Sequence, residues 1–293
     1  MIWLTGNKGM LGSELSFLME RGGIPFIGTD REVDIANPEA LDGFAGGRKI
    51  EWIINCAAYT AVDKAEDDAC SCLSLNAFGA GNIALCAEKI GAKLIHISTD
   101  YVFDGKGIKD NTGSIRPYRE DDETSPSGVY GLTKRDGEIA VLKNNSRSLI
   151  IRTAWLYGRC GNNFVHTMLR LMNERDEIKV VNDQYGSPTR AFDLCETILA
   201  AAEKEIPFGI YHYTNEGEIS WFDFAEEIYR LGRELNLVKK ECRVTSCSSG
   251  EYPSKVKRPA YSVLDKSKIK SALKSDIPLW NESLGNYLKT CAA

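Results

Sequence analysis

Two polar side chains four residues apart, Tyr130 and Lys134, have the types and spacing of a proton-transfer pair. On a helix this spacing places both side chains on one face, close enough to interact. A nearby ammonium favours phenolate and lowers the pKa of tyrosine from its reference value of about 10, which suits the residue for proton transfer near neutral pH. Because Tyr-x-x-x-Lys is also common on ordinary helix surfaces, its meaning depends on the motifs around it.

A glycine-rich turn near the N-terminus predicts a dinucleotide site. Gly6, Gly9 and Gly12 recur at every third position, after an apolar run and at the start of a helical pattern. Glycine lets the backbone approach a pyrophosphate, whose charge the free N–H groups and the helix dipole stabilise. Asp30 lies 18 residues after Gly12, close to where an acid binds ribose hydroxyls. The adjacent Arg31 could instead pair with the additional phosphate of NADP, so NADPH and NADH both stay open.

The segment Ser98-Thr99-Asp100 ends a predicted strand and supplies a third feature. The carboxyl ends of parallel strands form the edge at which such sheets bind ligands. Together with the glycine turn and the Tyr130–Lys134 pair, this position predicts a site for hydride transfer.

Alternating strand and helix patterns in the first half must position these groups. Apolar runs predict strands over residues 1–4, 24–29, 51–58, 93–98 and 148–154. Helical patterns follow the glycine turn and cover 65–91 and 130–142. Strands separated by helices of this length pair in parallel through right-handed crossovers. The sequence therefore predicts an α/β fold with a doubly wound parallel sheet of the Rossmann type.

The second half is less regular and predicts a smaller, discontinuous C-terminal substrate lobe. Two amphipathic helices and one β-rich segment that could rejoin the main sheet are predicted at 163–175, 220–235 and 208–214. We expect residues 1–157 to form the dinucleotide-binding domain, with a returning segment near 190–215, and 158–293 to form most of the substrate-binding lobe. The polar stretch 104–127 has no clear period, which indicates a lid or substrate loop.

Composition limits the kind of protein. The 293 residues include 36 basic and 41 acidic side chains, for a net charge of −5, which disfavours a nucleic-acid surface. No run approaches the roughly 18 consecutive apolar residues of a membrane span. The nine scattered cysteines indicate reduced thiols, and the close pair Cys70 and Cys72 lacks further ligands for zinc. We expect a cytoplasmic protein with no nucleic-acid or membrane partner.

Longer motifs identify a family. The order of glycine turn, strand-end threonine and Tyr-x-x-x-Lys is similar to the extended short-chain dehydrogenase/reductase superfamily. Within it, the chain resembles the dTDP-4-dehydrorhamnose reductases, through matches that run in order from residue 1 to about 285. The matching segments are 55–66, 96–105, 152–157, 161–164, 182–189 and 258–259.

The resemblance implies a reaction and a role for each site residue. The reaction is reduction of the 4-keto group of dTDP-4-dehydro-L-rhamnose to dTDP-L-rhamnose, with NADPH or NADH. Tyr130 would donate a proton to the carbonyl oxygen, Thr99 would hydrogen-bond that oxygen, and Lys134 would hold the nicotinamide ribose. Asp100 and Trp155 would contact the sugar nucleotide, as would Thr99. The expected cofactor-binding residues are Gly6, Gly9, Met10, Leu11, Gly12, Asp30, Arg31, Ala58, Tyr59, Thr60, Tyr130 and Lys134.

Two alternative functions stay open on the same fold. A nucleotide-sugar dehydratase would typically follow the threonine with aspartate and glutamate, but Asp100 is followed here by Tyr101, and an epimerase is also disfavoured. The non-catalytic, NADP-binding regulatory subunit of methionine adenosyltransferase also looks similar. A regulator need not keep Thr99, Tyr130 and Lys134 together, so their joint presence favours an enzyme.

The resemblance also raises the question of a metal-bridged homodimer. Some members are dimers bridged by Mg²⁺ through glutamates. Glu14 fits one such position, but Phe192 stands where a second carboxylate would be expected. Since Mg²⁺ needs several oxygen ligands, we expect activity without a structural metal and leave a homodimer open.

Two further side chains have competing interpretations. His96 lies inside an apolar strand and is expected to be a hydrogen-bonded core residue rather than a catalyst. Trp155 could pack in the core instead of contacting substrate, because most large aromatic side chains are packed.

Overall fold

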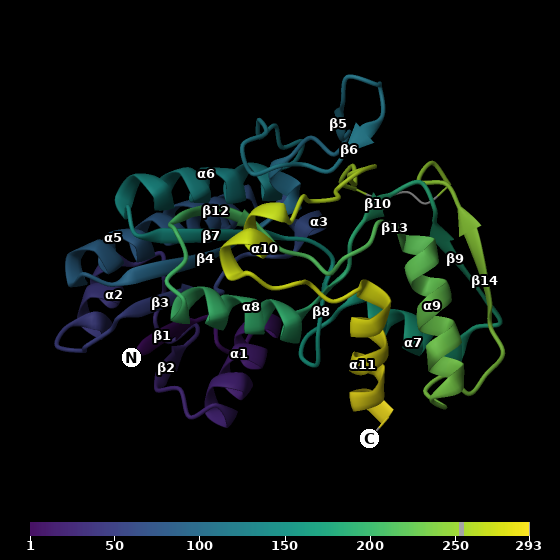
Figure 1. The fold of residues 1–293 in the computed structure, drawn as a ribbon, viewed down its shortest axis with the longest axis horizontal. Helices are drawn as coiled ribbons and strands as arrows, with labels where there is room; N and C mark the ends of the chain where they lie inside the picture. The colour runs from purple at the N-terminus through teal and green to yellow at the C-terminus, as the bar shows by residue number, and fades with distance from the viewer. Residues whose placement is uncertain (252–254, 293) are drawn as a thin grey trace.

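A six-stranded sheet forms the centre of the computed structural model, which describes residues 1–251 and 255–292 (Figure 1). The strand order is β12-β7-β4-β3-β1-β2, and all neighbouring strands pair in parallel. The six strands are β1 (Ile2–Thr5), β2 (Phe26–Thr29), β3 (Trp52–Asn55), β4 (Lys93–Thr99), β7 (Ser148–Thr153) and β12 (Gly209–His212). The predicted doubly wound parallel sheet is thereby confirmed.

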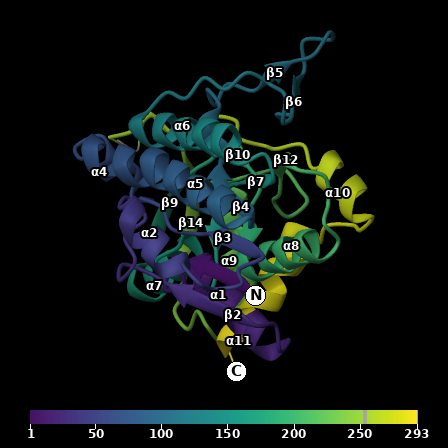
Figure 2. The same ribbon diagram turned by 90° about the vertical axis from the view of Figure 1, so that its left-hand side faces the viewer.

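Helices cover both faces of the sheet (Figures 1 and 2). One apolar core packs strand residues such as Leu4 and Ile54 against α1 (Met10–Arg21), α8 (Ala191–Glu203) and α10 (Ser267–Leu273). The other packs Trp3 and Ile53 against α2 (Pro38–Ala45), α5 (Ala80–Ile90) and α6 (Val129–Asn144). Neighbouring residues of a strand serve opposite cores because their side chains alternate between the two faces. The buried strands are accordingly apolar on both sides.

The prediction of one uninterrupted helix over 65–91 is wrong. The helix is interrupted at residues 66–68, after α3 (Val62–Ala65), and then runs without a gap through α4 (Ala69–Leu73), the π-helical turn η1 (Ser74–Gly79) and α5. Its predicted end at Gly91 is confirmed, since this glycine has the left-handed φ of 71°. The run Ala69–Ile90 is long and apolar enough on average to cross a membrane, which a search for consecutive apolar residues does not reveal. Half of its most apolar window is buried inside the protein, as in core helices that pass the same test.

Beyond β7 the chain alternates between the sheet and a third apolar cluster, which lies away from the sheet and is called the C-terminal cluster below. This cluster, at the right of Figure 1, is formed by α7 (Phe164–Glu174), β9 (Glu177–Val181), α9 (Trp221–Glu234), β14 (Arg243–Cys247) and α11 (Trp280–Ala292). The helices predicted at 163–175 and 220–235 are confirmed as α7 and α9. The predicted return of the chain to the main sheet is confirmed by β12, which pairs with β7. Short pairings join β8 (Leu156–Tyr157) to β11 (Thr189–Arg190), and β10 (Tyr185–Gly186) to β13 (Ile219–Ser220).

The aperiodic stretch 104–127 contains a small hairpin. It consists of β5 (Ile108–Lys109) and β6 (Ile115–Arg116), which project from the body of the protein beyond α6 (Figures 1 and 2). Its base is fixed by the buried Tyr118, whose hydroxyl donates to Asp104 at 2.7 Å and whose ring stacks on Phe103 at 4.2 Å. An anchored base with an exposed tip agrees with the lid that the sequence predicts, and this role stays a prediction.

Candidate active site

The glycine turn lies at the carboxyl edge of the sheet, where the strand order changes direction between β1 and β3. Gly6 has a φ of 67°, and a Cβ on it would lie 2.6 Å from the backbone nitrogen of Ala57. A Cβ on Gly12 would lie 2.1 Å from the Gly6 carbonyl oxygen. Both positions therefore require glycine. Helix α1 begins at Met10, and its N-cap Gly9 provides no side chain to occupy the first N–H groups.

The turn fits the phosphates of a nicotinamide dinucleotide. Its backbone can approach a ligand closely, and its free N–H groups and helix dipole favour an anion. Asn7, within the turn, has a buried side-chain oxygen without a hydrogen-bond partner in the described part of the chain. Leu11, by contrast, is buried in the core under α1, whereas Met10 is half-buried.

The two candidate determinants of cofactor choice lie beside this turn. Asp30 is half-buried directly after β2, and Arg31 is exposed. They lie close to the turn because the Asn7 N–H donates to the carbonyl of Thr29 at 3.1 Å. An acid and a guanidinium thus stand at the same edge, where a ribose hydroxyl or its phosphate would each find a partner.

The segment Ala58-Tyr59-Thr60 follows β3 and is held by a residue that the sequence does not indicate. Asn76 of η1 accepts from the Tyr59 N–H at 2.8 Å and donates to the Tyr59 carbonyl at 3.1 Å. The π-helical turn also lies tightly against α6, because a Cβ on Gly137 would lie 2.1 Å from the Asn76 carbonyl oxygen. The sequence signal that could have identified Asn76 is a polar amide inside an alanine-rich helix. Its position in a π-helical turn fits a functional role, because such turns are frequent at functional sites.

Thr99 and Tyr130 come together at the end of β4 and the start of α6. The Thr99 hydroxyl donates to the Asp100 carboxylate at 2.9 Å. Burial raises the pKa of the Tyr130 phenol, the negative charge of Asp100 raises it further, and a hydrogen bond with Thr99 acts in the opposite direction. The sequence-based expectation of a lowered phenol pKa is therefore wrong.

The Lys134 side chain points toward β4 and not toward the Tyr130 hydroxyl. It is 2% exposed, and its Nζ donates to the Ile97 carbonyl at 2.6 Å and lies 3.4 Å from Nε2 of His96. Burial lowers the pKa of Lys134 to about 8, although the charge of Glu138 opposes this shift. The sequence places the correct residues on α6, but the ammonium has other partners than the phenol. The prediction of His96 as a hydrogen-bonded core residue is confirmed.

A cleft of about 790 Å³ opens between the carboxyl edge of the sheet and the C-terminal cluster. Asp100 lies on its wall, and burial raises the pKa of this carboxyl to about 6, against hydrogen bonds from Thr99 and neighbouring groups. Trp155 also lines the cleft, in a left-handed conformation with a φ of 48°. The ring centre of its indole lies 3.5 Å from that of Trp221, on which it stacks. Trp155 is half-buried at the cleft and not enclosed in the core.

The cleft has a basic side that the sequence indicates only through Arg258. This guanidinium donates to the Tyr101 hydroxyl at 3.0 Å and pairs with Asp63. Lys179 and Lys255 also line the cleft. Lys255 pairs with Asp67, as Arg258 does with Asp63, so an anionic ligand would compete with these two carboxylates for the cations of the cleft. Trp221 and Lys179 come from distant elements and carry no motif that would have identified them.

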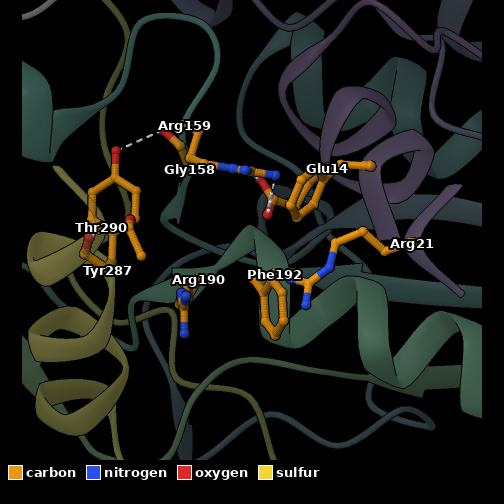
Figure 3. A pocket seen from close by; sticks show the side chains of 9 residues that line it. Glu14, Arg21, Gly158, Arg159, Arg190, Phe192, Tyr287 and Thr290 are labelled. Atoms are coloured by element: carbon orange, nitrogen blue, oxygen red, sulfur yellow. Dashed lines mark hydrogen bonds and ion pairs between the residues drawn. The ribbon is translucent and has the colours of Figure 1, made fainter. Parts of the chain in front are cut away.

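The position expected for a metal bridge contains an arginine. Figure 3 shows the pocket between α1, α8 and α11, where Arg159 bonds both carboxylate oxygens of Glu14 at 2.9 Å. Phe192 lines the same pocket, with the Arg190 guanidinium 4.7 Å from its ring centre. Within residues 1–251 and 255–292, no group of three or more His, Cys, Asp or Glu side chains is placed to hold a metal ion.

Comparison with known proteins assigns the family. A model of the RmlD substrate binding domain family matches residues 1–293. The chain belongs to the dTDP-4-dehydrorhamnose reductase family. It is 38% identical over 290 residues to such a reductase from Aggregatibacter actinomycetemcomitans, covering 97% of this chain and 96% of the relative. The crystal structure of the reductase from Bacillus anthracis, solved in complex with NADP, has a TM-score of 0.91 at 35% identity and covers 99% of this chain and 98% of its own.

The family makes this chain an NAD(P)-dependent oxidoreductase that binds a nicotinamide cofactor. Another relative, from Streptomyces antibioticus, is described as a "probable dTDP-4,6-dihydroxy-2-methyloxan-3-one 4-ketoreductase". It is 38% identical over 291 residues and covers 97% of this chain and 93% of its own length. Relatives of equal similarity therefore carry names for different sugars.

Proposed function

We propose that this enzyme reduces the 4-keto group of dTDP-4-dehydro-L-rhamnose to give dTDP-L-rhamnose. The observation that carries the proposal is the meeting of Thr99 and Tyr130 at the end of β4, next to Asp100 on the wall of the cleft, in a chain of this family. Bound NADPH or NADH supplies the hydride. Residues 1–157, with the returning segment near 190–215, hold the cofactor, and 158–293 supply most of the substrate-binding lobe.

Tyr130 donates the proton to the carbonyl oxygen as hydride reaches the carbon. The raised pKa of Tyr130 supports this role, because a proton donor must begin the reaction as the neutral phenol. The Thr99 hydroxyl releases the Asp100 carboxylate, donates its hydrogen bond to the same oxygen instead and stabilises the charge that develops on it. Lys134 holds the ribose of the cofactor, for which its Nζ leaves one of the contacts it has made with β4.

The wall of the cleft orients the sugar nucleotide. The Asp100 carboxylate accepts from a sugar hydroxyl, the Trp155 indole packs on the sugar nucleotide, and Arg258 faces the diphosphate. The stacked pair of Trp155 and Trp221 supports this arrangement, since two fixed indoles present a rigid apolar surface. The three cleft cations support an anionic substrate.

A second candidate is reduction of another 4-keto sugar on the same nucleotide. The relative from Streptomyces antibioticus favours it, because its name specifies a different deoxysugar at the same identity. To separate the two, purified enzyme receives dTDP-4-dehydro-L-rhamnose with NADPH or NADH, and loss of the reduced nicotinamide is followed. The uridine analogue and other dTDP-4-keto sugars serve as comparisons. Tight cofactor binding with no consumption of reduced nicotinamide on any keto sugar would contradict the proposal and favour a regulatory subunit.

Replacing Tyr130 tests the proton donor. Tyr130→Phe removes only the hydroxyl, and we expect turnover to fall about 10²-fold or more, with NADPH affinity largely kept. Tyr229→Phe removes a tyrosine hydroxyl on α9 that accepts from the Cys242 N–H at 3.3 Å and does not line the cleft, and it is the matched control. Turnover of Tyr130→Phe close to that of the control would refute the role.

Quaternary structure and location complete the proposal. We propose a cytoplasmic enzyme that acts without nucleic-acid or membrane partners, for which the nine free cysteines are the support. We keep the homodimer as a prediction and expect it to survive chelation, because Arg159 occupies the Glu14 carboxylate. Light scattering with and without EDTA measures both, and a dimer or a turnover that is lost on chelation would contradict us.

A further inference from the structure

A row of polar side chains crosses the sheet under α6, among otherwise apolar strands. Thr5, Asn55 and His96 are register partners on β1, β3 and β4. Each is 1% exposed. The Thr5 hydroxyl donates to Asn55 Oδ1 at 2.7 Å, and Asn55 Nδ2 lies 3.1 Å from His96 Nδ1. The other ring nitrogen of His96 faces Lys134, so the row ends at a residue of the proposed active site.

One backbone group fixes the direction of these hydrogen bonds. The Ala57 N–H, which can only donate, lies 3.1 Å from Asn55 Oδ1. This contact defines the amide orientation of Asn55, so its NH₂ group must donate to Nδ1 of His96. Burial and the charge of Lys134 hold the pKa of His96 well below its usual value. The neutral ring therefore carries its single proton on Nε2.

The Nε2–H of His96 points at Nζ of Lys134, 3.4 Å away. An ammonium has no lone pair to accept this proton, whereas a neutral amine has one. The amine can at the same time donate to the Ile97 carbonyl, with which Nζ makes its 2.6 Å contact. The geometry around Lys134 thus suits the neutral form better than the charged form.

The other titratable groups around Lys134 do not reverse this preference. On α6 itself, the carboxylate of Glu138 favours the ammonium, but it is held at 2.7 and 2.8 Å by Arg152 of β7. The thiols of Cys56, after β3, and Cys72, on α4, remain neutral because burial raises the pKa of each. Tyr130 is a neutral phenol for the same reason.

We propose that His96 is a positioning residue that favours the neutral amine of Lys134 and aims it for binding of the cofactor ribose. Asn55 acts through His96 by fixing the ring tautomer. The proposal rests on the proposed function for the place of the ribose, although not for the identity of the sugar. It predicts that Lys134 titrates in the range where the enzyme works, at a pH set by a histidine that does not itself change charge.

The first test observes the tautomer in the unmodified protein. Only three histidines are present, so long-range ¹H–¹⁵N spectra of the imidazoles can be assigned with single His variants. We expect two rings to stay neutral from pH 6 to 9, because burial lowers the pKa of both His96 and His212. The signal that is absent from His96→Asn should show its proton on Nε2. A His96 proton on Nδ1, or a charged ring at pH 6, would overturn the proposal.

The second test measures the pH dependence of NADPH affinity by fluorescence titration, which needs no turnover. For the unmodified enzyme we expect an inflection near pH 8. His96→Asn keeps an acceptor for Asn55 but removes the N–H that faces Lys134, and we expect its inflection to rise by about one pH unit, the change typical of one lost hydrogen bond. Asn55→Asp cannot donate to Nδ1, so it forces the ring proton to Nδ1 and should shift the inflection in the same direction.

The control is affinity at pH 6, where Lys134 is protonated in every variant and the three proteins should bind NADPH within about threefold of one another. An unchanged or lowered inflection in folded His96→Asn would overturn the proposal. If the inflection shifts as expected while no keto sugar is reduced, the proposed function fails and the role of His96 stands. If reduction occurs and the inflection does not shift, only the role of His96 fails.

Discussion

Two buried cations beside α6 differ in how their charge is compensated. The side chains of Arg152 and Lys134 are both about 2% exposed. Arg152 Nε and Nη2 donate to the two carboxylate oxygens of Glu138 at 2.8 and 2.7 Å, and its guanidinium lies 5.0 Å from the centre of the Phe103 ring. Among residues 1–251 and 255–292, the Lys134 Nζ contacts a carbonyl and a neutral imidazole and no carboxylate. One charge is paired within the fold and the other is left without a carboxylate.

The difference separates structure from chemistry. A buried guanidinium with a bidentate carboxylate has its charge compensated within the fold and can fix α6 to β7. A buried lysine without such a partner is destabilised in its charged form, so its pKa falls toward neutrality. Such a residue can bind or release a proton during the reaction. The contrast predicts opposite responses when each cation is perturbed.

The largest effect is expected from breaking the compensated pair. Glu138→Ala strands the Arg152 guanidinium and should lower the free energy of unfolding by about 3 to 5 kcal/mol. Urea denaturation measures the change. The double variant Glu138→Ala/Arg152→Met removes both charges and should recover most of the loss. If the single variant loses less than about 1 kcal/mol, the pair does not anchor α6.

Removing the uncompensated cation should act in the opposite direction. The folded-state pKa of Lys134 is lowered to about 8, so its charged form is penalised at pH values below 8 and the penalty disappears as pH rises toward the unfolded-state value. We expect Lys134→Met to raise the free energy of unfolding by about 1 to 2 kcal/mol at pH 7, after the lost contact with Ile97 is subtracted. NADPH binding should weaken at least about tenfold. The gain in the free energy of unfolding over the unmodified protein should be larger at pH 7 than at pH 10. A smaller gain at pH 7 than at pH 10 would contradict the comparison.

Asp100 extends the comparison to a buried acid and predicts a smaller gain. Its pKa is raised to about 6, so its carboxylate destabilises the fold above pH 6, and this penalty fades as pH falls toward the unfolded-state value near 4. Asp100→Asn keeps an oxygen for the Thr99 hydroxyl and should stabilise the protein by about 1 kcal/mol at pH 7.5. Thermal unfolding at pH 7.5 and 4.5 measures the difference. An equal gain at both pH values would show that the charge is not its cause.

The sequence predicts the sheet and the chemistry-bearing residues because both follow local rules. Apolar runs give the buried strands, and the glycine spacing gives the turn, since only glycine fits at Gly6 and Gly12. The π-helical turn η1 within the long helix does not follow from such rules, because it depends on how closely α6 packs. The partners of Lys134 are equally non-local, since His96 and Lys134 are brought together by strand register and helix docking. The phenol pKa was mispredicted because spacing along a helix says nothing of burial.

An exposed ion pair gives the baseline for these comparisons and the smallest effect. Arg170 and Glu174 lie one turn apart on α7, 2.8 Å from each other, with side chains 60% and 51% exposed. Solvent screens their attraction, and ordering two long side chains offsets much of what remains. Arg170→Ala should therefore change the free energy of unfolding by less than about 0.5 kcal/mol, and added salt should remove the difference. A loss comparable to that of Glu138→Ala would mean that burial does not decide how much an ion pair stabilises this protein. The difference between Arg152 and Lys134 would then need another cause.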